Sequence, residues 1–137
     1  MKHFFKNTPL HEFQRWGNGF ATDVLPTLIR PKAAAEIKRL QQSGTTIVIV
    51  SAAYESWVQK WTEQNNFQLL ATKPEVRDGK ITGGIAGKNC HGLEKVRCIK
   101  EAYALDQYDT ILAYGDSEGD KPMLELATEP HYKPFRD

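Results

Sequence analysis

Apolar and polar positions follow one another along the chain in blocks that predict helices and strands in turn. Residues 32–42 are rich in alanine, carry apolar residues at helical spacing and stop at Ser43-Gly44, which is typical of a helix that ends at a glycine. Residues 45–50 (Thr-Thr-Ile-Val-Ile-Val) are β-branched and apolar on both faces. That pattern favours a parallel strand covered on both sides.

The rest of the chain continues this alternation. Apolar periodicity predicts further elements over residues 54–64 (helix), 67–71 (strand), 93–105 (helix), 110–114 (strand), 121–127 (helix) and, at most as a short edge strand, 129–134. Asp78-Gly79 lies between two short alternating segments, the strongest local signal for a two-residue hairpin turn. A ragged apolar stripe, weakened by Gly17 and Gly19, predicts a helix over residues 8–25. The strand-helix-strand order predicts an α/β fold.

Composition narrows the class of protein. The chain has 137 residues, of which 40% are hydrophobic and 26% charged, with a formal net charge of +1. A chain of this length is expected to have a single hydrophobic core. Its net charge is too small to produce a positive electrostatic field that would attract nucleic acid. It has no apolar run of the ~20 residues needed to span a membrane. Lys2, His3 and Lys6 interrupt any signal-peptide pattern, and Cys90 and Cys98 are the only cysteines. We expect a cytoplasmic protein, with one disulfide left open.

Polar residues follow two of the predicted strands. Ser51 comes directly after residues 45–50, and Gly115-Asp116 follows residues 110–114. Ligands bind at the carboxyl ends of parallel strands in open sheets, so both positions are candidate site residues. Asp116 and Asp120 flank a tight loop, a spacing that lets both carboxylates face one hard cation, of which Mg²⁺ fits best. The plain alternative is an acidic loop, and we expect Asp120 also to cap the following helix.

Lys95 adds a positive charge near the start of the helix predicted over residues 93–105. Its ammonium and the nearby backbone amides are suited to an anionic group. Alone, Lys95 would usually be a surface lysine, and Ser51 a strand-end hydroxyl bonded to local backbone. The ordered combination is more specific than either residue.

That order is Val-Ile-Val-Ser-Ala, then Asn-Cys-His-Gly-Leu-Glu-Lys-Val, then Ala-Tyr-Gly-Asp-Ser-Glu-Gly-Asp-Lys-Pro-Met-Leu. It resembles the haloacid dehalogenase-like (HAD) hydrolases, specifically the phosphoserine-phosphatase-like branch, subfamily IB, over residues 27–132. The resemblance implies a three-layer αβα Rossmann-like core with a parallel sheet. It also implies that residues 1–30 are the remnant of a helical cap and residues 31–137 an incomplete core domain.

The resemblance also assigns roles to individual residues. It implies that Ser51 and Ala52 bind the transferring phosphoryl group, that Lys95 neutralises its charge, and that Asp116 and Asp120 hold Mg²⁺ directly or through water. Three further residues would support this set: Glu94 would orient Lys95, Gly115 would allow close backbone approach, and Ser117 lies in the metal loop.

One part of the family pattern is missing. Its first motif is a strand ending in Asp-x-Asp-x-Thr, whose first Asp attacks phosphorus and whose second is general acid and base. No two aspartates of this chain lie two residues apart; they are Asp23, Asp78, Asp106, Asp109, Asp116, Asp120 and Asp137. The expectation is an N-terminally truncated chain that lacks the central strand and the nucleophile.

The missing strand would leave two strand edges open, and open edges promote association. We therefore expect self-association, a partner chain that supplies the strand, or a rearranged local segment, for which His3-Phe4-Phe5 is too short.

Three functions remain open at this stage. The first is a Mg²⁺-dependent phosphatase, acting on a small phosphorylated metabolite or a lipid headgroup, of which this chain is a C-terminal portion that is inactive alone. The second is a phosphate- or Mg²⁺-binding module without a nucleophile, or a subunit that needs a partner chain. The third is a receiver-like or flavodoxin-like domain, which the hairpin at Asp78-Gly79 and the approach to Lys95 do not favour.

Overall fold

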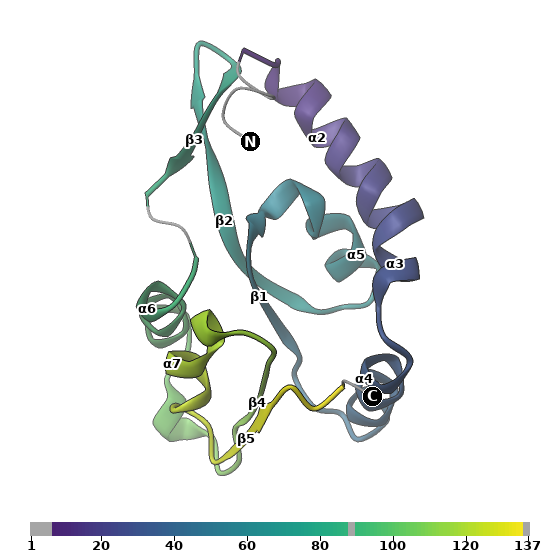
Figure 1. Ribbon diagram of the computed structural model, residues 1–137, viewed down its shortest axis with the longest axis vertical. Coiled ribbons are helices and arrows are strands. Elements are labelled where there is room, and N and C mark those ends of the chain that lie inside the picture. Colours follow the sequence, from purple (N-terminus) through teal and green to yellow (C-terminus); the bar gives the residue numbers. More distant parts are fainter. Residues whose placement is uncertain (1–6, 88–89, 136–137) are drawn as a thin grey trace. The chain divides into compact units, whose positions relative to one another are not determined.

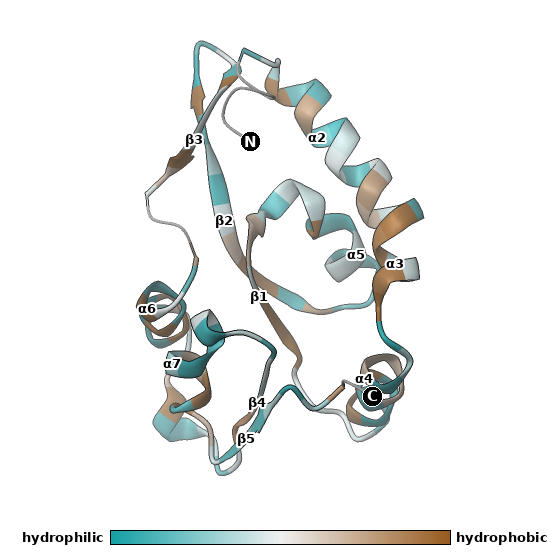
Figure 2. Ribbon diagram, in the orientation of Figure 1, coloured by the Kyte–Doolittle hydropathy of each residue, from teal (hydrophilic) through white to brown (hydrophobic). Residues whose placement is uncertain are grey.

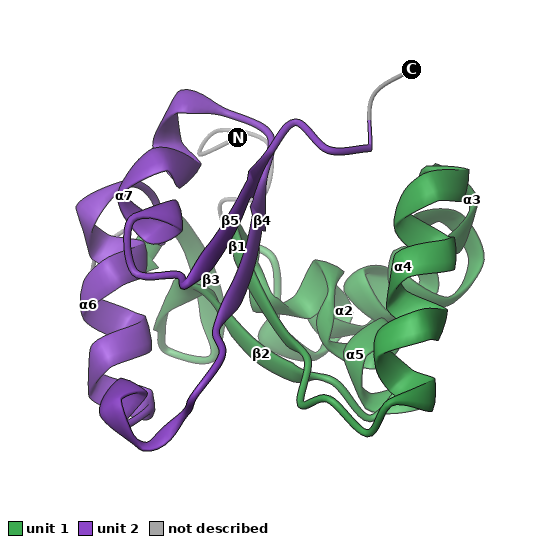
Figure 3. Cartoon of the chain, turned by 90° about the horizontal axis from the view of Figure 1, so that it is seen from below, with its two compact units in different colours: residues 1–89 green, residues 90–137 purple. Residues whose placement is uncertain are grey.

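The chain divides into two compact units, residues 1–89 and residues 90–137 (Figure 3). This computed structural model describes residues 7–87 and 90–135. Lys2, Lys6 and the segment His3-Phe4-Phe5, on which two of the sequence predictions rest, lie outside the described residues. The predicted boundary between a cap remnant and a core at residue 30 stays a prediction.

The first unit is built on a three-stranded sheet (Figure 1). Its strands are β1 (Val48–Tyr54), β2 (Gln68–Arg77) and β3 (Lys80–Ala86), in the order β1-β2-β3. The first half of β2 pairs in parallel with β1, and its second half pairs antiparallel with β3. Figure 2 shows the apolar start of β1. The strand predicted over residues 45–50 begins three residues later, at Val48, and its first residues are half-buried. The predicted parallel strand pair is confirmed.

The hairpin between β2 and β3 turns at the predicted residues. Asp78 and Gly79 have φ of 53° and 74°, and Arg77 pairs with Lys80 across the turn. Two consecutive positive φ values define the tight turn that matches the twist of antiparallel strands, and Asp-Gly tolerates them best. The local turn chemistry therefore sets the register of this hairpin.

Helices precede β1 and connect β1 to β2. They are α2 (Leu10–Gly19), a π-helical turn (Phe20–Val24), α3 (Leu25–Leu28), α4 (Pro31–Gln42), a 3₁₀ turn (Glu55–Trp57) and α5 (Gln59–Gln64). The helix predicted over residues 32–42 is confirmed as α4. It ends as predicted, because the amides of Gly44 and Thr45 donate to the carbonyls of Gln41 and Leu40 at 3.1 and 3.0 Å.

The end of β1 was predicted wrongly, because the strand continues past Ser51 to Tyr54. Tyr54 is buried with Phe13 of α2 and Ile81 of β3, and the rings of Phe13 and Tyr54 meet edge to face at 5.6 Å. Its hydroxyl donates to the carbonyl of Gly84 at 3.1 Å. These contacts hold Tyr54 in extended backbone, so the predicted helix over residues 54–64 becomes a 3₁₀ turn followed by the shorter α5.

Two glycines of α2 differ in their surroundings and so provide a matched test. A Cβ at Gly17 would lie 2.2 Å from the carbonyl oxygen of Ser56, whereas a Cβ at Gly19 would meet nothing within 4 Å. We expect Gly17→Ala to destabilise the chain by about 1–3 kcal/mol because of this overlap. Gly19→Ala should stabilise it by about 0.5–1 kcal/mol through helix propensity. Urea unfolding of both variants tests this, and equal shifts of the two would contradict the packing at Gly17.

The second unit pairs two short strands in parallel. Its elements are α6 (Leu93–Ala102), a 3₁₀ turn (Leu105–Gln107), β4 (Leu112–Gly115), a 3₁₀ turn (Glu118–Asp120), α7 (Lys121–Leu124) and β5 (Glu129–Tyr132). Each predicted element exists, and the two helices are shorter than predicted. Helix α6 ends before Tyr103, whose backbone is extended with φ of −134° and ψ of 136°.

Among the described residues, strand pairing is limited to these two sheets and one isolated bridge between Pro9 and Lys80. In them, β1 pairs with β2 and β4 pairs with β5, as the α/β class predicts. Self-association through the strand edges, or pairing with a strand from another chain, stays a prediction. No helix within residues 7–87 and 90–135 has both the length and the apolar character needed to cross a membrane.

Candidate functional site

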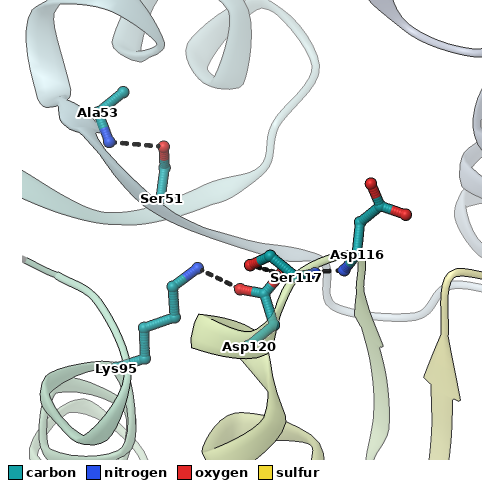
Figure 4. A network of polar contacts seen from close by, with 6 residues as sticks. All are labelled: Ser51, Ala53, Lys95, Asp116, Ser117 and Asp120. Atoms are coloured by element: carbon teal, nitrogen blue, oxygen red, sulfur yellow. Dashed lines mark hydrogen bonds and ion pairs between the residues drawn. The ribbon is translucent and has the colours of Figure 1, made fainter.

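A buried ion pair joins α6 to the loop after β4. Lys95 lies in the first turn of α6 and is 6% exposed, and its Nζ donates to Oδ1 of Asp120 at 2.8 Å (Figure 4). The Asp120 side chain is 16% exposed. A lysine this buried requires a charged partner, because an unpaired ammonium would lose its hydration without compensation. Sequence reasoning proposed both residues, and the fold of the second unit brings them together.

The second oxygen of Asp120 organises the loop itself. Oδ2 accepts the amides of Asp116 and Ser117 at 2.9 and 3.2 Å and the Ser117 hydroxyl at 3.3 Å. Ser117 and Asp120 thereby form a capping box around the 3₁₀ turn at residues 118–120. The expectation that Asp120 caps the following helix was wrong, since its side chain makes no capping bond to α7. The carboxylate turns toward the preceding amides because they, together with Lys95, donate hydrogen bonds to it.

These contacts lower the pKa of Asp120. Desolvation by burial raises the pKa, but the hydrogen bonds from Lys95, Asp116 and Ser117, with the Lys95 charge, outweigh it and hold the pKa below its usual value.

Acid should therefore weaken this part of the molecule. Because the folded pKa of Asp120 is depressed, its contribution is present above the unfolded value of about 3.9 and is lost as pH falls through the folded pKa. We expect Asp120→Asn to be less stable than the parent chain at neutral pH and the difference to shrink in acid. Urea unfolding followed by circular dichroism at a series of pH values measures it. A constant difference between about pH 7 and about pH 2 would contradict this assignment.

Asp116 follows β4 directly and is exposed. Its carboxylate points away from that of Asp120 (Figure 4), so the two acids do not face a common point in this conformation. Within the described residues, no group of three or more acidic, histidine or cysteine side chains is gathered around one point. The donors are nevertheless all oxygens, which suits Mg²⁺, an ion that keeps several waters and takes one or two carboxylates. Asp116 is thus the candidate direct ligand.

Only glycine fits at position 115. A Cβ there would lie 2.6 Å from Cβ of Asp120, so any larger residue would displace the carboxylate that holds the loop. The sequence-based expectation was that Gly115 allows close backbone approach. The structure shows that the group approaching Gly115 is the Asp120 side chain.

Ser51 belongs to the first unit, where the ladder between β1 and β2 becomes irregular. Pairing with β2 runs from Val48 to Ser51 and resumes at Tyr54, which leaves Ala52 and Ala53 out of register. The Ser51 Oγ accepts the amide of Ala53 at 3.1 Å (Figure 4). Irregular strand pairing of this kind is common next to active sites, where it redirects side chains. The phosphate-binding role of Ser51 and Ala52 stays a prediction.

Glu94 and the two cysteines complete the description of the second unit. The Glu94 carboxylate accepts Arg97 Nε at 2.6 Å, and its predicted role in orienting Lys95 stays a prediction. Cys90 and Cys98 hold thiols and form no disulfide. Burial, followed by the effect of Cys98, raises the pKa of the Cys90 thiol to about 11.

Comparison with protein families identifies the family of this chain. The family model for haloacid dehalogenase-like hydrolases matches residues 1–125. The chain therefore belongs to the haloacid dehalogenase-like hydrolase family, within which it is similar to the phosphoserine phosphatases.

Individual relatives extend the comparison. Protein CicA of Caulobacter vibrioides is 33% identical over 138 aligned residues, which cover 99% of this chain and 62% of CicA. A protein of unknown function from Bordetella pertussis has the same fold with a TM-score of 0.74 and 27% identity, covering 88% of this chain and 56% of that one. A phospho-aspartyl intermediate analogue of phosphoserine phosphatase matches with a TM-score of 0.67 and 22% identity, over 90% of this chain and 57% of the other. The chain thus spans less than two thirds of the length of these proteins.

Proposed function

We propose that this chain carries the phosphate- and Mg²⁺-binding part of a phosphomonoester phosphatase and that residues 1–137 bind phosphate without hydrolysing its esters. The observation that carries the proposal is the buried Lys95–Asp120 pair beside the exposed Asp116. A buried cation next to an exposed carboxylate suits a phosphoryl group and its metal ion. Bound Mg²⁺ would neutralise charge on the phosphoryl oxygens.

Lys95 would contribute the fixed positive charge. Its ammonium has three donors, so Lys95 can hold Asp120 and also meet a phosphate oxygen. Asp120 keeps the ammonium oriented, while its other oxygen holds the loop that carries Asp116. We propose Asp116 as a direct Mg²⁺ ligand and Asp120 as a ligand through water, since both Asp120 oxygens already accept hydrogen bonds.

Ser51 and Ala52 would contact the same phosphoryl group from β1. Because the Ser51 Oγ accepts from Ala53, its hydroxyl proton is directed elsewhere and can be donated to an anion. The Ala52 amide, out of register with β2, is a second donor. We propose that these groups and Lys95 bind the same phosphate, because the family motifs follow one another in this order.

The inactivity of this chain follows from its missing nucleophile. Family catalysis needs an aspartate that attacks phosphorus and is then released by water, and no Asp-x-Asp pair occurs in the chain. Cys90 is a poor replacement, because it is 1% exposed and its pKa is raised to about 11, so it is rarely a thiolate at neutral pH. The second candidate is a phosphate- or Mg²⁺-binding module without a nucleophile, or a subunit that needs a partner chain. An Asp-x-Asp-x-Thr strand encoded upstream of this chain would rule out that candidate.

A Mg²⁺ titration of the chain tests the metal site. In ¹⁵N spectra, we expect Mg²⁺ to move the amide signals of Asp116 and Ser117 saturably, and Asp116→Asn to abolish the response. Asp109→Asn, which changes an acid outside the loop, is the matched control and should leave the titration unchanged. Equal titrations of the parent chain and Asp116→Asn would refute the assignment of the metal ligand.

A further inference from the structure

The loop before α6 lies against the loop that holds Asp120. A Cβ at Gly119 would lie 2.1 Å from Nε2 of His91 and 2.6 Å from its Cδ2, so the imidazole occupies the space over the Cα of Gly119. The amide of Gly92 donates to the Gly119 carbonyl at 3.0 Å. The peptide that leads into Asp120 is thus contacted by a ring on one side and by a hydrogen bond at its oxygen.

From these contacts we infer that His91 is a positioning residue for the loop at residues 116–120, which carries the proposed Mg²⁺ ligands. The peptide between Gly119 and Asp120 determines where the Asp120 carboxylate points, and that carboxylate holds Lys95 and the amides of Asp116 and Ser117. By resting on Gly119, the His91 ring fixes this peptide and, through it, the direction of Asp116. The effect on Mg²⁺ rests on the proposed function, whereas the effect on the loop hydrogen bonds does not.

The glycine at position 119 supports this role independently. Its backbone lies outside the left-handed region in which only glycine is comfortable, so the chain geometry does not demand a glycine there. The group close to position 119 is the imidazole: a Cβ there would meet three atoms of the ring, so a larger residue requires the ring to move. His91 is nonetheless exposed, so its ring is not needed to fill a buried core. Its contact serves the loop and contributes little to hydrophobic burial.

Amide chemical shifts of the metal-free chain test the inference directly. We expect His91→Ala to move the Asp116 and Ser117 amide protons upfield, toward values of weaker hydrogen bonds to Asp120. His91→Phe, which keeps a flat ring over Gly119, should restore most of the native shifts. His11→Ala, on the exposed side of α2, is the control and should leave them unchanged. A role confined to general stability would change the unfolding midpoint without moving these two signals.

A double-mutant comparison adds the coupling between the two residues. Mg²⁺ affinity should fall on the order of 10-fold in His91→Ala and in Gly119→Ala, as for other groups that orient a metal ligand. In the His91→Ala background, Gly119→Ala should add no more than about a 2-fold loss, because the colliding ring is gone. If Gly119→Ala unfolds the chain while the double variant folds, that result also shows that the His91 ring and a side chain at position 119 compete for the same space.

Unchanged Asp116 and Ser117 shifts in His91→Ala, or losses that add fully in the double variant, would overturn the inference. A parent chain that binds no Mg²⁺ would refute the proposed metal site, while the metal-free shifts would still decide the role of His91.

Discussion

Hydrolysis of an aryl phosphate is expected to be undetectable for residues 1–137 and to appear when the chain is extended at its N-terminus by a strand ending in Asp-x-Asp-x-Thr. Removing a nucleophile from a comparable catalytic set costs on the order of 10⁴ to 10⁶ in rate, so the difference should be of that size. The proposed phosphate-binding groups would stabilise a bound anion but would form no bond to phosphorus. The rate of phenolate release in the presence of Mg²⁺ measures hydrolysis by the original and the extended chain.

Control variants show whether the added strand supplies the nucleophile or only stabilises the fold. Changing the first Asp of the added strand to Asn should abolish hydrolysis while leaving the fold, because the amide keeps the shape but does not attack. Hydrolysis by residues 1–137 that disappears in Asp116→Asn would contradict the account, since another group would then be the nucleophile.

Lys95→Met should cost about 3 kcal/mol of folding free energy. The substitution removes one partner of a buried ion pair and leaves the Asp120 carboxylate charged, and such breaks cost about 3–5 kcal/mol. The lower figure applies because Asp120 is 16% exposed and keeps its bonds to the loop amides. Urea unfolding of the variant measures the loss.

The matched control lies on the same helix. Lys100 is exposed near the end of α6, and Lys100→Met should change stability by no more than about 0.5 kcal/mol. The double variant Lys95→Met with Asp120→Asn should recover part of the loss, because it no longer buries an unpaired charge. Equal effects of Lys95→Met and Lys100→Met would show that the ion pair contributes nothing.

Local signals in the sequence predicted a large part of the fold. The turn at Asp78-Gly79 and the end of α4 at Gly44 were both predicted correctly, because each depends on residues within one turn. The extension of β1 to Tyr54 could not be predicted in this way. It depends on contacts with Phe13 and Ile81, which come from distant parts of the chain.

The candidate site divides in the same manner. Lys95 and Asp120 were singled out from motif order, and the structure pairs them although 25 residues separate them. The direction of the Asp120 carboxylate, toward the preceding amides, depends on Lys95 and was predicted wrongly from local capping preferences. The contact of His91 with Gly119 had no sequence signal, because nothing in the local pattern distinguishes a glycine required for space from one required for a turn.

Binding of inorganic phosphate to residues 1–137, measured by ³¹P NMR with and without Mg²⁺, tests the proposed site most directly. We expect saturable binding that Mg²⁺ strengthens. We also expect Lys95→Met to weaken phosphate binding roughly 10- to 100-fold, the value of a hydrogen bond to a charged group. Phosphate binding that is equal in the parent chain and in Lys95→Met, or that ignores Mg²⁺, would contradict the assignment of this site.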